Sequence, residues 1–90
     1  MTKKLFGQWL KQQLAFHSLS YRQFETETGI NRSNLSHYIS GRSAPTAKRL
    51  QQLASFFADV DVKAGHVDNE QRVARRNRYL LDMLAVIEVK

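Results

Sequence analysis

Apolar residues recur at helical spacing along most of the chain. The apolar positions of the first segment, from about residue 3 to residue 17, are Leu5, Phe6, Trp9, Leu10 and Leu14. This stripe predicts an amphipathic helix. Gly7 lies inside the stripe, where a glycine costs about 1 kcal/mol relative to alanine.

Turn residues divide the next part of the chain into two short helices. Ser20 and Gln23 form a capping-box pattern that predicts a helix start at Ser20, and Gly29 predicts its end. Asn31 is a good cap for a second helix, which Gly41 ends. The link between the two helices is only three residues long, Gly29-Ile30-Asn31.

A fourth amphipathic segment begins after Pro45, with Thr46 as its cap. The spacing of its apolar positions is i, i+3, i+4, i+7, and they are Leu50, Leu53, Ala54 and Phe57. Polar and apolar residues alternate in the first part of residues 59–67. This alternation predicts a linker that is extended or contains a short strand. Residues 68–90 predict a further helix, although the β-branched residues at positions 86–89 also favour an extended end.

The net charge of +6 lies entirely in residues 1–58, because positive and negative charges balance in residues 59–90. A small basic domain favours an anionic partner, with nucleic acid first and an anionic membrane surface second. No stretch approaches the ~18 uninterrupted apolar residues of a membrane span. We therefore expect no membrane association and a cytoplasmic, nucleoid-associated protein in a bacterium or a phage-infected host.

Two short helices joined by a glycine-containing link are typical of a helix-turn-helix, in which the second helix enters the major groove of DNA. The polar face of residues 31–40 is rich in hydrogen-bonding side chains, and no acidic residue occurs between Thr28 and Ala58. The spacing of Ser20, Gly29, Gly41 and Pro45, with the Leu-x-x-Leu-Ala pattern of residues 50–54, resembles the Cro/cI-type (XRE-type) helix-turn-helix domain, as found in phage repressors. The resemblance covers residues 5–57.

The resemblance implies an all-α, lambda-repressor-like bundle of four to five helices, with residues 1–58 as the DNA-binding domain. It implies that the third helix reads bases through Arg32, Ser33, Asn34, Ser36 and His37. An arginine suits the guanine edge, where its guanidinium bonds bidentately. The implied phosphate contacts are Tyr21, Arg22, Ser40, Arg42 and Lys48. Thr28 departs from the family pattern, because an aliphatic residue is common at its position.

Residues 68–90 are more apolar than a free tail, so they either fold back on the core or pair with a second copy. We predict a homodimer formed by Leu80, Leu81, Leu84 and Ile87, because exposed apolar patches mark interfaces. The basic run of residues 72–78 is interpreted as a solvated helix face, with an extra phosphate-contacting arm as the alternative.

Catalysis is not expected. The chain has no cysteine, and its three histidines lie on different segments without metal-ligand spacing. No nucleophile with a paired base is apparent, so we expect no metal, cofactor or small-molecule substrate. The sequence predicts a transcriptional regulator that binds double-stranded DNA, specifically a repressor that binds a near-palindromic operator. The alternative is an antitoxin or adaptor whose C-terminal segment binds a different protein.

Overall fold

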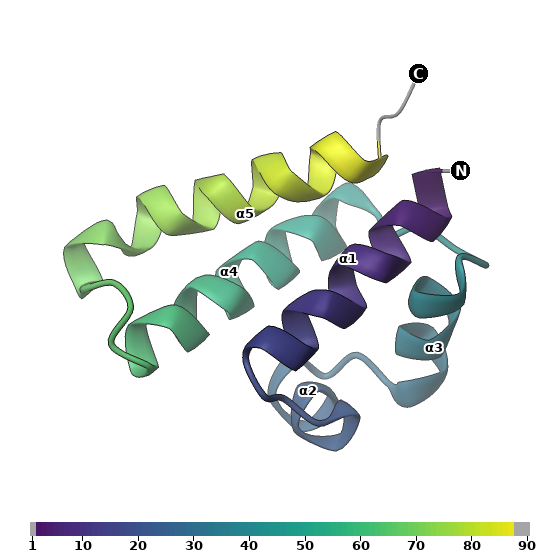
Figure 1. Ribbon diagram of the computed structural model, residues 1–90, viewed down its shortest axis with the longest axis horizontal. Coiled ribbons are helices and arrows are strands. Elements are labelled where there is room, and N and C mark those ends of the chain that lie inside the picture. Colours follow the sequence, from purple (N-terminus) through teal and green to yellow (C-terminus); the bar gives the residue numbers. More distant parts are fainter. Residues whose placement is uncertain (1, 88–90) are drawn as a thin grey trace.

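The computed structural model describes residues 2–87, and the side chains of residues 5–86. Every regular element in this range is helical, which confirms the predicted all-α class (Figure 1). In chain order the elements are α1 (Thr2–Phe16), α2 (Tyr21–Thr28), α3 (Arg32–Ser40), α4 (Ala47–Lys63), the short 3-10 helix η1 (Asn69–Gln71) and α5 (Arg72–Ile87).

The predicted caps start three of these helices. The Ser20 hydroxyl accepts a hydrogen bond from the Gln23 amide at 3.0 Å, and the Gln23 side chain accepts one from the Ser20 amide at 2.9 Å. Asn31 Oδ1 caps α3 by accepting from the Asn34 amide at 2.8 Å, and Thr46 Oγ1 caps α4 in the same way. Each cap satisfies an amide that has no partner within its helix.

Glycines end α2 and α3 as predicted. Gly29 and Gly41 have φ of 76° and 81°, a left-handed conformation that only glycine adopts at little cost. The amide of Gly29 donates to the Glu25 carbonyl at 2.9 Å. The chain therefore leaves α2 and enters α3 within three residues.

The prediction of a linker over residues 59–67 is wrong for residues 59–63, because α4 continues to Lys63. The alternation of aspartate and valine there also fits a helix, in which Asp61 falls on the buried stripe that includes Phe57 and Ala58. Tyr79 donates a hydrogen bond to the buried Asp61 carboxylate, which makes a polar residue acceptable at this position. The true connection to η1 is short.

The C-terminal segment folds back on the core, the alternative to the pairing with a second copy that the sequence favoured. α5 packs along α4 and against α1. Tyr79 and Met83 are buried, and Leu80 and Leu84 are partly buried against the same core. The helix continues to Ile87, so residues 85–87 are not extended. Residues 88–90 and the Ile87 side chain lie outside the described part.

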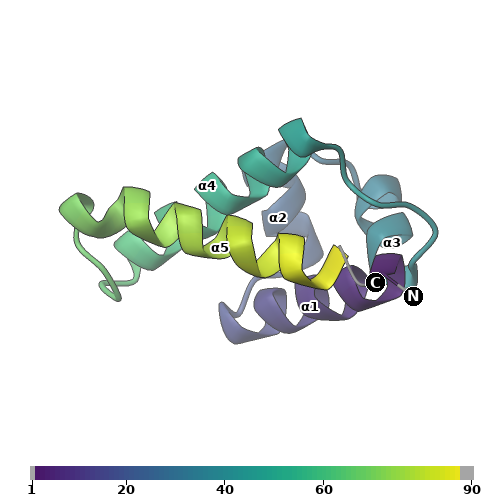
Figure 2. The ribbon, with the colours of Figure 1, turned by 90° about the horizontal axis from the view of Figure 1, so that it is seen from above.

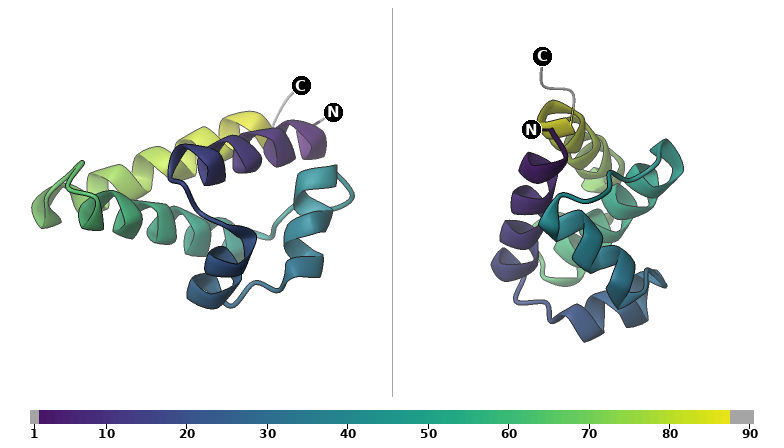
Figure 3. Two further views of the ribbon diagram at one scale, coloured as in Figure 1. Left: turned by 60° about the horizontal axis from the view of Figure 1, so that its bottom comes forward. Right: turned by 90° about the vertical axis from the view of Figure 1, so that its right-hand side faces the viewer.

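The helices form one body in which α1, α4 and α5 pack together and α2 and α3 lie to one side (Figure 3, left). α5 lies beside α4, and α3 lies at the opposite end from the α4–α5 connection (Figure 2). The core is contributed by every α-helix, with Phe6, Leu10, Leu14, Phe24, Leu35, Leu53, Phe57 and Met83 among its buried residues. Within residues 2–87 no helix is both long enough and apolar enough to cross a membrane.

Candidate nucleic-acid interface

α3 has one buried face and one solvent-exposed face. Leu35 and Tyr38 are buried, and the Tyr38 ring packs edge-on against Phe6 of α1 at a centroid distance of 6.0 Å. The other face consists of the five side chains that the sequence predicted as base-reading, all of them exposed: Arg32, Ser33, Asn34, Ser36 and His37. The burial of one face therefore leaves these polar side chains free to contact a ligand.

A glycine in α1 sets how closely α3 approaches. A Cβ built on Gly7 would lie 2.3 Å from the Tyr38 carbonyl oxygen and 2.5 Å from that of Ile39. Both contacts are with backbone atoms, which cannot rotate away as a side-chain end can. Gly7 is thus a position where the end of α3 packs directly on the backbone of α1. The sequence interpretation treated this residue only as a weak point of a helix, although its place inside an amphipathic stripe was a signal of close packing.

The turn between α2 and α3 is braced by Thr28. Its hydroxyl donates to the Phe24 carbonyl at 2.7 Å and accepts from the Ile30 amide at 3.1 Å. Gln52 of α4 donates to the Thr28 carbonyl at 2.6 Å. The Thr28 hydroxyl therefore satisfies two backbone groups of the turn, at a position where the family favours an aliphatic residue. Through Gln52, α4 holds the same turn from the other side.

The predicted phosphate contacts come from the ends of three helices. Tyr21 and Arg22 begin α2, Ser40 and Arg42 lie at the end of α3, and Lys48 lies in the first turn of α4; all five are exposed. The Arg42 amide donates to the His37 carbonyl at 2.9 Å. This bond fixes the backbone of Arg42 beside the end of α3.

A hollow of about 280 Å³ lies at the start of α4, lined by Thr46, Lys48, Arg49 and Gln52. Arg49 donates to the Gln52 side chain at 2.9 Å. Two cations and the free amides of a helix start favour an anion there. The sequence patterns did not single out Arg49 or Gln52, and the Gln52 contact with Thr28 joins positions far apart in sequence.

The part of the chain that contains α3, residues 29–58, has no aspartate or glutamate. The nearest acidic residues along the chain, Glu25 and Glu27, belong to α2. Glu27 lies 3.7 Å from Lys63 in an ion pair between carboxylate oxygen and Nζ. The exposed face of α3 therefore carries only neutral and cationic side chains, as contact with phosphodiester requires.

A buried polar cluster joins α1, α4 and α5 on the side away from α3. Asp61 is 1% exposed, and its Oδ2 accepts a hydrogen bond from the Tyr79 hydroxyl at 2.6 Å. His17 Nδ1 lies 3.8 Å and His66 Nδ1 lies 3.4 Å from Asp61 Oδ1. Two histidines that are distant in sequence therefore meet at one carboxylate, which the sequence did not indicate. No group of side chains in the described range has the arrangement of a metal site.

Burial shifts the pKa values of two side chains in this cluster, His17 and Tyr79. Desolvation lowers the pKa of His17 below its ordinary 6.5, with the Asp61 charge opposing the shift and His66 adding to it. Desolvation, followed by the hydrogen bond to Asp61, raises the pKa of the Tyr79 phenol well above its ordinary 10. The neutral forms of both side chains are therefore favoured at neutral pH.

Comparison with known proteins agrees with the geometry. A family model described as helix-turn-helix matches residues 10–63, more than half of the chain, and covers α2, α3 and α4. Neither the curated proteins nor the solved structures contain a match. A capped α2, a three-residue turn and a polar, acid-free α3 within the matched range show that the chain belongs to the Cro/cI-like (XRE-type) helix-turn-helix family of DNA-binding transcription regulators.

Proposed function

We propose that the protein is a repressor that binds a near-palindromic operator as a homodimer, with α3 in the major groove. The observation that carries this proposal is the exposed, acid-free face of α3, held by burial of Leu35 and Tyr38. A helix that presents its polar face outward in this way fits the width of the major groove.

The two sets of predicted contacts have different roles in this proposal. Base edges are contacted by Arg32, Ser33, Asn34, Ser36 and His37. Phosphates are contacted by Tyr21, Arg22, Ser40, Arg42 and Lys48, with Arg49 added from the hollow at the start of α4. The first set supplies sequence preference, whereas the second supplies affinity and register.

The proposed dimer surface lies on the outer side of α5. Leu81 is 66% exposed on α5. Leu80 and Leu84 are partly buried against the core of their own chain. Two copies that meet here would each supply one α3, as a near-palindromic site requires. Ile87, the fourth predicted residue, has no described side chain.

DNA binding and its salt dependence test the proposal first. Sites selected from a random DNA pool would report half-site sequence and spacing, and a gel shift at two salt concentrations would report phosphate contacts. Affinity should fall steeply with salt, because binding releases counterions from DNA. Binding that ignores salt, or no binding to any duplex, would contradict the proposal.

Two matched substitutions separate the proposed roles. Arg32→Ala should relax base preference at one position of the half-site, at a cost of about 1–3 kcal/mol. Lys48→Ala should weaken selected and scrambled duplexes alike and reduce the salt slope by about one. Equal effects of the two substitutions on sequence preference would show that α3 is not the reading element.

The dimer is tested by native mass and by analytical ultracentrifugation. Leu81→Glu should yield a monomer, whereas Val73→Glu, which changes another exposed apolar residue of α5, should leave the dimer intact. A chain that is monomeric at all concentrations, or one isolated in a fixed ratio with a different protein, would contradict the homodimer.

A further inference from the structure

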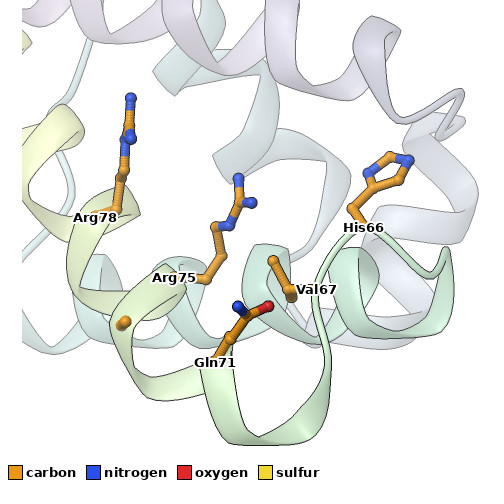
Figure 4. Close-up of a pocket in the computed structure, with 6 residues that line it drawn as sticks. His66, Val67, Gln71, Arg75 and Arg78 are labelled. Carbon is orange, nitrogen blue, oxygen red and sulfur yellow. The ribbon is translucent and has the colours of Figure 1, made fainter.

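Two hollows lie along α5, from the α4–α5 connection to the middle of the helix, and two arginines line both of them. One hollow, of about 400 Å³, is lined by His66, Val67, Gln71, Ala74, Arg75 and Arg78 (Figure 4). A second hollow, of about 300 Å³, has Arg75 and Arg78 on its wall together with Gln13, Phe16, Tyr79 and Asp82. Because the two hollows share both arginines, we treat them as one site and call it the α5 groove.

The two arginines of the α5 groove differ in their partners. Residues three apart on a helix face the same way, and Figure 4 shows the Arg75 and Arg78 side chains extending from α5 in the same direction. Arg78 is exposed and makes no hydrogen bond or ion pair with the side chains of residues 5–86. Arg75 Nε lies 3.8 Å from Asp61 Oδ2 in an ion pair, so its charge is shared with that buried carboxylate.

The first hollow suits a phosphate better than the second. No carboxylate lines the first hollow, whereas Asp82 lines the second. Guanidinium groups bind phosphate oxygens through paired, charge-assisted hydrogen bonds, and the Gln71 amide is a further donor beside them. A phosphate group in the first hollow would therefore meet two guanidinium groups and an amide.

An aromatic side chain lies beside these donors. Phe16 is 70% exposed, although a phenylalanine normally packs inside. Its ring lies 5.1 Å from the His17 ring and 6.5 Å from the His66 ring, measured between centroids. Phe16 lines the second hollow while His66 lines the first, so an aromatic surface spans the α5 groove. Such a surface stacks with a planar base.

The position of the groove separates it from the DNA interface. The α4–α5 connection and the start of α5 lie at one end of the molecule, and α3 lies at the other (Figures 1 and 3).

We propose that the α5 groove binds a nucleoside monophosphate, with the phosphate between Arg75 and Arg78 and the base stacked on Phe16. This ligand matches the charge of the first hollow and the aromatic wall of the second. The residues of the α5 groove are distinct from those proposed to contact DNA in the preceding section and from Leu80, Leu81 and Leu84 of the proposed dimer surface.

Adenosine monophosphate, inorganic phosphate and adenosine are the probes, each titrated at constant ionic strength into the isotope-labelled protein and followed by NMR. We expect saturable amide shifts from the nucleotide at residues 13–17, 66–67 and 71–79. Phosphate alone and adenosine alone should each bind at least about tenfold more weakly, because each lacks one of the two sets of contacts.

Arg78→Gln should weaken nucleotide binding at least about tenfold, since it removes charge-assisted hydrogen bonds to the phosphate. Arg76→Gln is the matched control: it makes the same charge change on the same helix, but Arg76 does not line either hollow. Phe16→Ala should weaken binding of the nucleotide but not of phosphate. Operator binding, measured in parallel, should be unchanged in all three variants.

Equal weakening by Arg76→Gln and Arg78→Gln would overturn the proposal, because it would indicate diffuse attraction to a basic helix. Shifts confined to α3, or no saturable shift at all, would also overturn it. Tighter binding of a single-stranded RNA than of the nucleotide through the same residues would replace the small ligand by RNA. Circular dichroism of each variant would confirm that a loss of binding is not a loss of fold.

Discussion

Substitution of Gly7 by alanine tests how the helix-turn-helix is held in place. In an isolated helix this change would stabilise by about 1 kcal/mol, because alanine is the better helix former. Here the new methyl group would lie 2.3 Å from the Tyr38 carbonyl oxygen and 2.8 Å from the Ile39 carbonyl carbon. The gain from helix propensity is therefore opposed by a backbone clash.

The size of the displacement follows from these distances. Ordinary contact between a methyl carbon and such atoms requires about 3.5 Å, so the end of α3 must move away from α1 by roughly 1 Å. Overpacking of this kind costs about 1–3 kcal/mol. After subtraction of the propensity gain, we expect Gly7→Ala to lower the free energy of unfolding by about 0–2 kcal/mol.

DNA recognition should suffer more than stability. A hydrogen bond at 2.9 Å is lost when its partners separate by about 1 Å, and a good bidentate base contact is worth about 1–3 kcal/mol. We expect Gly7→Ala to weaken binding to a selected operator by about ten- to hundredfold. Binding to a scrambled duplex should change little, because phosphate attraction tolerates small shifts.

The assay is fluorescence anisotropy with both duplexes, alongside urea unfolding of the same variant. Gln8→Ala, an exposed change in the same helix, is the control and should alter neither measurement appreciably. An operator affinity equal to that of the unsubstituted protein, together with a stability gain of about 1 kcal/mol, would refute the close packing of α1 on α3.

Two further predictions concern the Asp61 cluster. Because burial lowers the pKa of His17, the unfolded chain binds a proton more readily than the folded protein does. The free energy of unfolding should therefore fall as the pH drops below about 6.5 and level off below the pKa of the folded state. In the His17→Gln variant the midpoint of urea unfolding should change less between pH 7.5 and 5 than in the unsubstituted protein. Equal changes of the midpoint with pH in the two proteins would contradict this. Tyr79→Phe should lower the free energy of unfolding by about 1–3 kcal/mol, because the Asp61 carboxylate loses its hydrogen-bond donor at 2.6 Å. The same substitution at the exposed Tyr21 should lower it by less than about 0.5 kcal/mol. Equal losses at the two positions would refute the role of the buried hydrogen bond.

The parts of the fold that sequence patterns predicted are those encoded by neighbouring residues. The caps at Ser20, Asn31 and Thr46 each use a partner three residues away, so their pattern is visible in the chain. The helix ends at Gly29 and Gly41 depend on one residue each. For the same reason the spacing of apolar and polar residues was sufficient to assign the polar face of α3.

The parts that escaped prediction depend on partners far along the chain. The role of Gly7 exists only because Tyr38 and Ile39 pack on it. The buried position of Asp61 depends on partners far along the chain, among them Tyr79 and His17, and without such partners an aspartate predicts a surface or a linker. The placement of α5 is of the same kind, since an apolar stripe does not specify whether its own domain or a second copy covers it.

The packing of α5 has a consequence for how the chain can be divided. The family match ends at residue 63, yet Met83 and Tyr79 fill the core beside Phe57 and Trp9. A fragment cut at the family boundary would expose an aromatic surface to water and lose a large share of a small core. The segment that matches the family model is therefore shorter than the segment that forms the hydrophobic core of this protein. A destabilising substitution on the inner side of α5 would therefore lower DNA binding indirectly, because it lowers the fraction of molecules that are folded.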